Sequence, residues 1–441
     1  MFPKRFRAST AALAAALALG CLHGAHAQSL QAVYDAAHAY DATYLAARAL
    51  AQSAEFRVAQ VEALGLPALS ATAGASTAQN DYPKIGLSGV NSRQVGLNGR
   101  YPLFNRANSV TIDQARRSLD SATADLDSAE QDLIVRVAQT YFDVLAAQDT
   151  LGTTRANKAA ITETLASAKR NFEVGTATIT DTREAQARFD LATAQEIAAD
   201  NDLLTKRLAL DQLVGRTGIV PLPLLVPVLL PVTVPANADE WVSVADTRHP
   251  AVLRARVALD VAQFETSKAK AGSLPTLDAV AGLGVSSSRG AAIALPGTTQ
   301  SASIGVQMNW PLYTGGAIQN RVRETLVLED KTRNDLEAAR RGVAQGTRVA
   351  YFGVQSGEAQ VKALEAAEAS SKLALEATQL GYKVGVRVNL DVLNAQTQLF
   401  QTQRDLAKAR YDVLVGSLKL RQASGRLTPE DLAATNRLLR P

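Results

Sequence analysis

The feature that most constrains this 441-residue chain is an internal duplication, in which similar residues recur at a nearly constant separation. Asp181 corresponds to Asp391, 210 positions further along the chain. Other matches near this separation are Leu66–Leu69 with Leu274–Leu277, Tyr101–Phe104 with Trp310–Tyr313, Tyr141-Phe142 with Tyr351-Phe352, Phe172–Gly175 with Tyr382–Gly385, and Gly215-Arg216 with Gly425-Arg426. Because the matches keep their order, they predict one structural unit that is used twice.

A proline-rich segment separates the two copies. Five prolines lie between residues 221 and 235, and proline at this density prevents a helix because it lacks the backbone donor. The predicted organisation is a first repeat over 28–216, a proline-rich linker over 217–240, a second repeat over 241–426 and a C-terminal segment over 427–441.

Residues 1–27 have the layout of a secretory signal peptide. Three basic residues precede a short apolar stretch, and Ala25-His26-Ala27 is a suitable cleavage site. Cys21 offers an alternative as a lipoprotein acylation site, although Ala18 stands three positions earlier where leucine is usual. Both alternatives export the chain from the cytoplasm, and we favour cleavage after Ala27.

Charge and residue types exclude two classes of function. Without Lys4, Arg5 and Arg7 the net charge is (46 − 3) − 42 = +1, and no basic run is interleaved with aromatic residues, so we expect no nucleic-acid partner. The chain has one cysteine and four histidines, and it contains no G-x-S-x-G, P-loop or H-E-x-x-H motif. We therefore expect no catalytic, cofactor or metal site.

Each copy reads as a helix, two strands, a long helix, a turn and a return helix. Apolar residues of the first copy recur at seven-residue intervals from Ile112 to Leu133, which is typical of coiled coils. No proline occurs between Asn105 and Phe172, so one helix of about 67 residues and ~100 Å is predicted there. These features alone also fit a soluble periplasmic coiled-coil adaptor or structural protein.

The predicted strands argue against that alternative. They lie at about 67–80, 93–104, 276–286 and 301–313, and they alternate apolar residues with small or polar ones. Aromatic residues stand at the strand ends, as in strands that face lipid on one side and water on the other. Four strands cannot close a barrel, and open strand edges are prohibitive in lipid, so several chains would have to combine their strands.

The ordered motifs resemble the TolC-type outer-membrane efflux protein family. They include Leu274–Leu277, Tyr313–Gly316, Gly381–Gly385, Leu390–Leu393 and Gly425–Leu427. The resemblance implies a mainly α-helical homotrimer with a membrane β-barrel portion, in which each chain supplies four strands to a twelve-stranded barrel. A helical barrel would continue across the periplasm, and residues 217–240 and 427–441 would form an equatorial belt.

The resemblance also implies function, location and partners. The protein would be an exit duct in the outer membrane, extending into the periplasm and contacting outer-membrane lipid. It would work with a periplasmic adaptor (membrane fusion) protein and an inner-membrane ABC or proton-driven transporter. Type I protein secretion is favoured over small-molecule drug efflux, because cleavage rather than acylation is typical of the secretion branch.

The two turns, 172–181 and 381–391, are the candidate functional positions. From the residues alone, Asp181 would begin a helix and form a capping box with Glu184, and Asp391 would likewise be an N-cap. Gly175 and Gly385 suit the C-caps of the preceding helices. These residues could simply shape the turns.

The resemblance assigns further roles at these turns. Asp391 matches an aspartate of a ring that constricts the periplasmic entrance, and Asn394 stands where the family has a second ring aspartate. Tyr382 and Arg387 match residues that are linked to Thr180 and Asp181, so an Arg387–Asp181 ion pair is expected. The predicted adaptor contacts are four residues in the turns, Val174, Gly175, Val384 and Gly385.

Overall fold

The computed structural model describes residues 28–82, 86–225, 227–228, 230–289 and 297–440. The predicted signal peptide, including Cys21, lies outside these residues. The chain divides into two compact units. Of the described residues, unit 1 comprises those within Met1–Ala46, Ser128–His249 and Val343–Pro441, and unit 2 comprises those within Ala47–Asp127 and Pro250–Gly342.

Long helices dominate the fold, as the heptad spacing predicts. Helix α4 (Arg106–Glu173) has 68 residues and α8 (Ala317–Lys383) has 67, so the prediction of one uninterrupted helix in each copy is confirmed. Each is followed by a return helix, α5 (Ile179–Val214) or α9 (Asn389–Ala423). The remaining helices are α2 (Leu30–Tyr40), α3 (Ala42–Glu62), the 3-10 helix η2 (Ala63–Gly65), α6 (Ala238–Arg248), α7 (Pro250–Ala271) and α10 (Pro429–Asn436). Among the described helices, none combines the length and apolarity that crossing a membrane would require.

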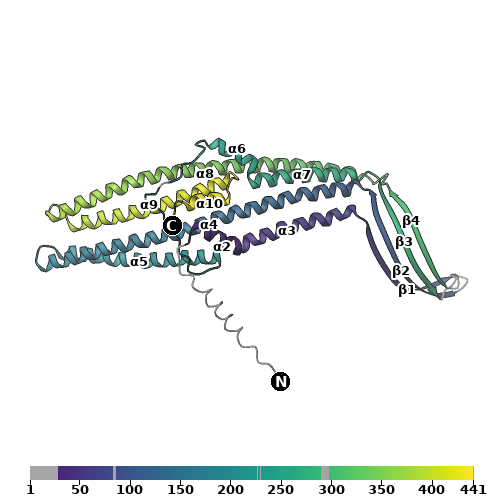
Figure 1. Ribbon diagram of the computed structural model, residues 1–441, viewed down its shortest axis with the longest axis horizontal. Helices are drawn as coiled ribbons and strands as arrows, with labels where there is room; N and C mark the ends of the chain where they lie inside the picture. The colour runs from purple at the N-terminus through teal and green to yellow at the C-terminus, as the bar shows by residue number, and fades with distance from the viewer. Residues whose placement is uncertain (1–27, 83–85, 226, 229, 290–296, 441) are drawn as a thin grey trace, which may run out of the picture. The chain divides into compact units, whose positions relative to one another are not determined.

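Unit 2 contains the four-stranded antiparallel sheet of β1 (Ala68–Tyr82), β2 (Gly86–Phe104), β3 (Thr276–Arg289) and β4 (Gly297–Asn309), in that spatial order (Figure 1). Strand β2 begins before the predicted residue 93, because residues 86–92 pair with β1 although their sequence does not alternate strictly. Strand β4 begins at Gly297 and ends before the predicted residue 313, since Pro311 cannot donate a ladder hydrogen bond.

The register places the apolar residues of neighbouring strands on one face of the sheet. Leu97 lies opposite Leu283, which in turn lies opposite Ala302, and Val95 lies opposite Val285. We call this the apolar face. The other face carries glycine, serine, threonine and amide side chains, together with an ion pair of 2.6 Å between Arg100 and Asp278.

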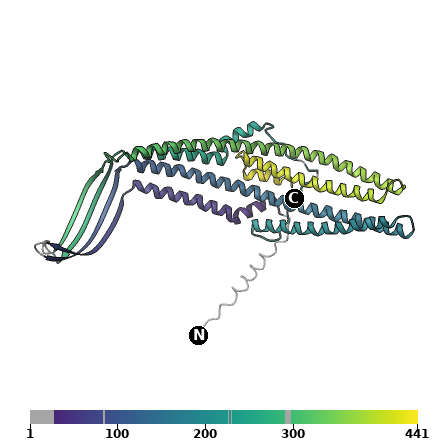
Figure 2. The same ribbon diagram turned by 180° about the vertical axis from the view of Figure 1, so that it is seen from behind.

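Unit 1 contains two helical hairpins. Figures 1 and 2 both show α5 returning beside the second part of α4, and α9 returning beside the second part of α8. Leu133 of the predicted α4 seam is fully buried, and so are Val137 and Val144 further along the same helix. The second hairpin closes over a cluster of Val361, Leu406, Ala409 and Val413.

The linker in unit 1 pairs with segments from both ends of the described chain. The Gln28 backbone N–H donates to Val220 at 2.8 Å, and the Leu225 N–H donates to the Leu438 carbonyl at 2.9 Å. The buried Tyr141 hydroxyl of α4 donates to the Gln28 carbonyl and accepts from the Leu222 N–H, at 3.0 and 2.7 Å. The linker is therefore held in an extended conformation by hydrogen bonds to other segments, because its prolines prevent a helix.

Candidate functional site

The two helical tips are the ends of the hairpins in unit 1, and both begin with the same C-cap. Gly175 and Gly385 have φ of 79° and 80°, a conformation that favours glycine. The N–H of Gly175 donates to Phe172 and that of Thr176 donates to Asn171, and the equivalent pair of bonds forms at the second tip. These are Schellman motifs, so the prediction of glycine C-caps is confirmed.

The N-cap of α5 differs from the prediction. Thr178, not Asp181, is the N-cap, and Asp181 occupies the third helical position. The Asp181 N–H donates to the Thr178 hydroxyl at 3.2 Å, while the Asp181 carboxylate accepts from the Thr178 N–H at 2.9 Å. The predicted box with Glu184 is wrong because the helix starts at Ile179, which makes Thr178 and Asp181 the reciprocal pair.

The N-cap of α9 is weaker. Here Val388 is the N-cap, so the prediction that Asp391 takes that position is also wrong. Valine has no side-chain oxygen, and only half of the box exists: the Asp391 carboxylate accepts from the Val388 N–H at 3.4 Å. The same carboxylate lies 3.8 Å from the Arg387 guanidinium. Asp391 is therefore held less tightly than Asp181.

The other predicted tip contacts are rearranged within one chain. Arg387 pairs with Asp391 and the expected Arg387–Asp181 pair is not formed, because the Asp181 carboxylate is engaged by Thr178. Tyr382 accepts a hydrogen bond from Asn171 at 3.4 Å rather than contacting Thr180, whose side chain is exposed. This bond links the ends of α8 and α4.

Asn394 has a partner that sequence reasoning missed. Its side-chain oxygen accepts a hydrogen bond of 2.8 Å from Arg188, so it links α9 to α5. The two residues are 206 positions apart, and no local pattern in the sequence indicates this pairing. Thr178, by contrast, had a sequence signal in its spacing from Asp181.

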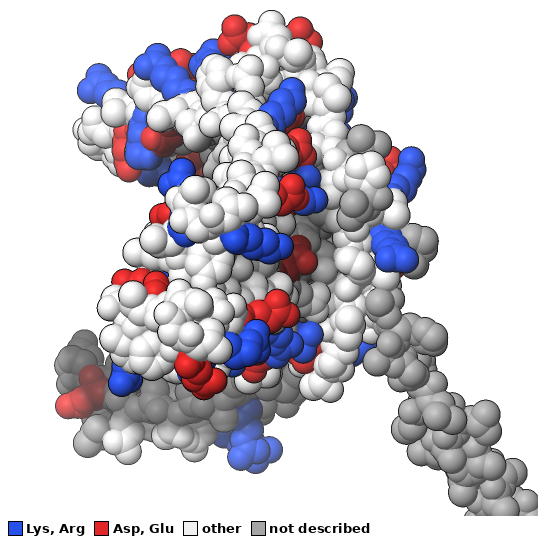
Figure 3. Space-filling model, turned by 90° about the vertical axis from the view of Figure 1, so that its left-hand side faces the viewer, with Lys and Arg blue, Asp and Glu red and all other residues white. Residues whose placement is uncertain are grey.

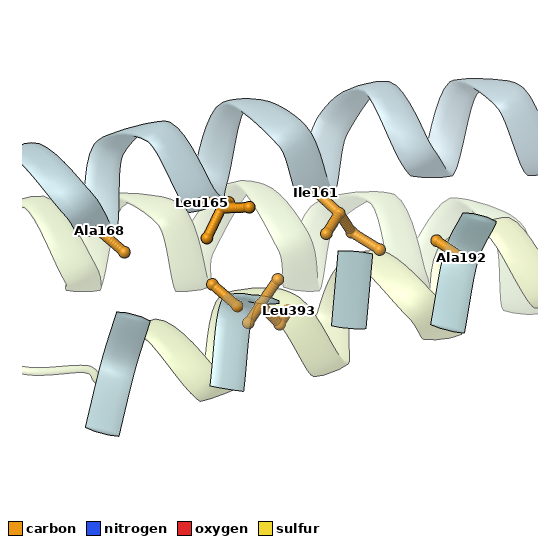
Figure 4. Packing of buried hydrophobic residues seen from close by; sticks show 6 residues of the cluster. Ile161, Leu165, Ala168, Ala192 and Leu393 are labelled. Atoms are coloured by element: carbon orange, nitrogen blue, oxygen red, sulfur yellow. The ribbon is translucent and has the colours of Figure 1, made fainter. Parts of the chain in front are cut away.

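An apolar cluster fixes the start of α9 against the first hairpin. Leu393 is completely buried among Ile161, Leu165 and Ala168 of α4 and two alanines of α5, Ala185 and Ala192 (Figure 4). Burial of this leucine against the small alanines anchors the first turns of α9 to the first hairpin.

The tips expose apolar side chains to solvent. Val174, Val384 and Val386 expose 65–75% of their surface. The end view in Figure 3 shows Lys and Arg interspersed with Asp and Glu over the helices that carry the tips. Within the described ranges, no group of three or more His, Cys, Asp or Glu side chains is placed to hold a metal ion.

Comparisons with known proteins agree on a family. The model of the family described as "Outer membrane efflux protein" matches residues 33–216 and 241–426. The outer membrane protein TolC of Vibrio cholerae is 33% identical over 95% of this chain and 96% of its own length. The alkaline protease secretion protein AprF of Pseudomonas aeruginosa is 34% identical over 68% of this chain, and the match spans 63% of AprF.

The fold is also that of solved channels. The CmeC outer membrane channel of Campylobacter jejuni superposes with a TM-score of 0.77, covering 93% of this chain and 90% of CmeC at 17% identity. At that identity the likeness concerns the fold alone.

Proposed function

Because the chain belongs to the outer membrane efflux protein family, we propose that it is the outer-membrane exit duct of a tripartite export system. It conducts substrate passively from an inner-membrane pump across the periplasm and the outer membrane. The observation that carries this proposal is the sheet, which has one apolar face and whose edge strands, β1 and β4, pair on one side only among the described residues.

The apolar face is suited to lipid. Ile304 exposes 91% of its surface, and Leu69, Val95, Val306 and Met308 each expose more than 60%. So large an apolar surface is unusual on a water-soluble protein. In lipid the same residues are favourably placed, and the small polar residues of the other face line water.

The open sheet edges require further copies of the chain. An unpaired edge costs several kcal/mol per backbone group in lipid, since no water satisfies it. Three copies joined through β1 and β4 form a closed barrel of twelve strands, which is the homotrimer proposed here. Helix surfaces fit the same assembly: Ile197 and Leu204 of α5, and Leu373 and Leu380 of α8, are exposed apolar residues at seven-residue spacing.

The tips form the periplasmic gate in this proposal. Three weakly capped Asp391 carboxylates around the axis repel one another and attract cations. Asp181, Thr180, Tyr382, Arg387 and Asn394 complete the gate, and the Arg387–Asp181 pair remains a proposal for contacts between chains. The exposed Val174, Gly175, Val384 and Gly385 contact the periplasmic adaptor protein.

We favour type I protein secretion over small-molecule efflux as the purpose of the duct. The support is the similarity to AprF, which is named for protease secretion. The genes beside this one distinguish the two uses: an ABC exporter with a secreted protein fits secretion, whereas a proton-driven pump fits drug efflux. In either case the chain reaches the outer membrane after signal-peptide cleavage.

The alternative, a soluble periplasmic adaptor or structural coiled coil, leaves the apolar face without a role. The deciding experiment places a lysine on either face of β4 and follows membrane fractionation and trimer formation. Ile304→Lys puts a charge toward lipid, at a cost of about 2–4 kcal/mol at mid-membrane, and should abolish outer-membrane assembly. Ser303→Lys, one residue away on the polar face, should assemble normally. Equal assembly of both variants, or wild-type chain in the soluble fraction, would refute the duct.

A further inference from the structure

Two arginines interrupt the apolar face at its hairpin end. Arg93 of β2 lies opposite Ser287, and Arg289 of β3 lies opposite Asn91. Arg93 is two residues from Val95, and Arg289 is four residues from Val285. Because side chains alternate between the faces of a strand, both arginines lie on the same face as these valines. Both are exposed. This placement is unusual because arginine on a lipid-facing surface is costly near the centre of the membrane.

The position of the arginines along the strands removes that cost. Tyr101 marks the helix-proximal end of the apolar rows, and eight residue steps separate it from Arg93. At ~3.4 Å per residue these steps cover ~27 Å, or ~21 Å along the membrane normal for a strand tilt of ~40°. An apolar band is about 25 Å tall, so the Arg93 backbone lies ~4 Å inside its far edge, and Arg289, opposite Asn91 two residue steps further on, lies at that edge. The long arginine side chains extend from there to the lipid headgroups.

The two guanidinium groups can act on one ligand. Arg93 and Arg289 are diagonal neighbours on adjacent strands, a relation that places β-carbons ~7–8 Å apart, within reach of long side chains. Among the described residues neither makes an ion pair, unlike Arg100 on the opposite face, which is held by Asp278. Asp81 is the one acidic residue on the apolar face in the described strands. It lies opposite Leu87, four residue steps from Asn91, and is therefore distant from both arginines. Within the described strands, the two neighbouring arginines therefore have no carboxylate partner.

We propose that Arg93 and Arg289 form a binding site for the phosphate group of a lipid in the membrane leaflet that surrounds the hairpin end of the sheet. Arginine offers a planar fork of donors that binds phosphate oxygens in pairs, and two such forks enclose a phosphate from both sides. The acyl chains of the same lipid lie along Val95, Leu97 and Leu283. The inference rests on the proposed duct, because only a membrane-embedded sheet presents this face to lipid.

The test measures lipid binding by the purified full-length oligomer in detergent. The probe is fluorescently labelled lipid A, which carries two phosphates, and the comparison lipid is diacylglycerol with the same label, which carries none. We expect Arg93→Gln with Arg289→Gln to weaken lipid A binding by roughly tenfold or more, because charge-assisted hydrogen bonds are lost. Binding of diacylglycerol should not change. Arg323→Gln with Arg341→Gln removes the same two charges from α8 and should leave lipid A binding unchanged.

Trimer formation and bilayer conductance of each variant are measured in parallel. If wild-type protein forms conducting trimers but lacks a preference for lipid A, or if the sheet and α8 variants bind lipid A equally, the phosphate site is refuted while the duct stands. If the wild-type chain neither trimerises nor conducts, both proposals fail. Loss of lipid A binding in a sheet variant that still trimerises and conducts supports the site.

Discussion

At the scale of single residues, the two tips differ by the hydroxyl group that completes a helix cap. The Thr178 side chain completes the capping box at α5. Val388 has no hydroxyl, so only one of the two capping hydrogen bonds forms at α9. We predict that Val388→Thr stabilises the second tip by about 1 kcal/mol, because the hydroxyl would accept the Asp391 N–H. Hydrogen exchange over residues 388–392 measures this as slower exchange. Val386→Thr changes another exposed valine, outside the cap, and is the control. An equal effect there would contradict the prediction.

A second residue-scale prediction concerns pH and Glu265 of α7. Burial by itself raises the pKa of Glu265, but the hydrogen bond from Arg321 and the nearby Lys268 outweigh it and hold the pKa below its ordinary value. A lowered carboxyl pKa contributes stability that is present above the unfolded pKa and is lost as pH falls through the folded pKa. Glu265→Gln should therefore lower the melting temperature at pH 7 and reduce the loss of stability below about pH 4.5.

The measurement is thermal unfolding of the detergent-solubilised protein between pH 3 and pH 8. Wild type and Glu265→Gln should converge at the acid end, where the wild-type carboxyl is also neutral. Glu324→Gln, which removes a more exposed partner of the same Arg321, should have a smaller effect. A constant difference between wild type and Glu265→Gln at every pH would show that the charge is not responsible.

At the scale of elements, the gate proposed above would depend on how α5 and α9 are held at their first turns. Asp181→Ala with Arg387→Ser removes the cap carboxylate from α5 and the cation beside Asp391, so the Asp391 groups repel more strongly. We predict a higher single-channel conductance of the reconstituted protein. Arg183→Ser with Asp190→Ala changes the same residue types further along α5 and should not alter it. Wild-type conductance in the gate variant would remove the gating assignment.

The link between α5 and α9 gives a prediction of opposite sign. Asn394→Asp replaces a neutral acceptor of the Arg188 hydrogen bond by a carboxylate, and charge-assisted hydrogen bonds are roughly twice as strong. The tip should open less often, by about several-fold in open probability, in single-channel recordings. Gln398→Glu places the same charge one turn further along α9 and away from Arg188. If Gln398→Glu has the same effect, added charge rather than the α5–α9 link is the cause.

These elements also show what the sequence alone can predict. The 68-residue α4 follows from a proline-free heptad pattern, and the C-caps follow from Gly175 and Gly385, because both signals are local. The start of β2 and the Arg188–Asn394 bond depend on partners far along the chain, so local patterns missed them. The helix start at Ile179 differs from the prediction because threonine and aspartate both cap helices, and the structure places Thr178 at the N-cap and Asp181 at the third helical position.

At the scale of the whole molecule, the described part of a single chain leaves apolar helix surfaces exposed and two sheet edges paired on one side only. Its α5 and α8 helices expose apolar residues at heptad spacing, and a coiled-coil seam of this kind is stable only when a partner helix covers it. Packing of these seams between chains would bury their apolar residues. Pairing of β1 with β4 of a neighbouring chain would satisfy the backbone groups at the sheet edges. The homotrimer proposed above would meet both requirements in one symmetric assembly.

The last prediction separates the helical seam from the sheet edge. Leu204→Asp places a charge in the α5 seam, where burial on association leaves it unpaired, and should shift the protein from trimer to monomer in detergent. Thr205→Asp, the neighbouring exposed residue on another side of the helix, should remain trimeric. Analytical ultracentrifugation in density-matched detergent measures the mass of each. A trimeric Leu204→Asp variant that also conducts would mean that the sheet edges hold the assembly without this seam.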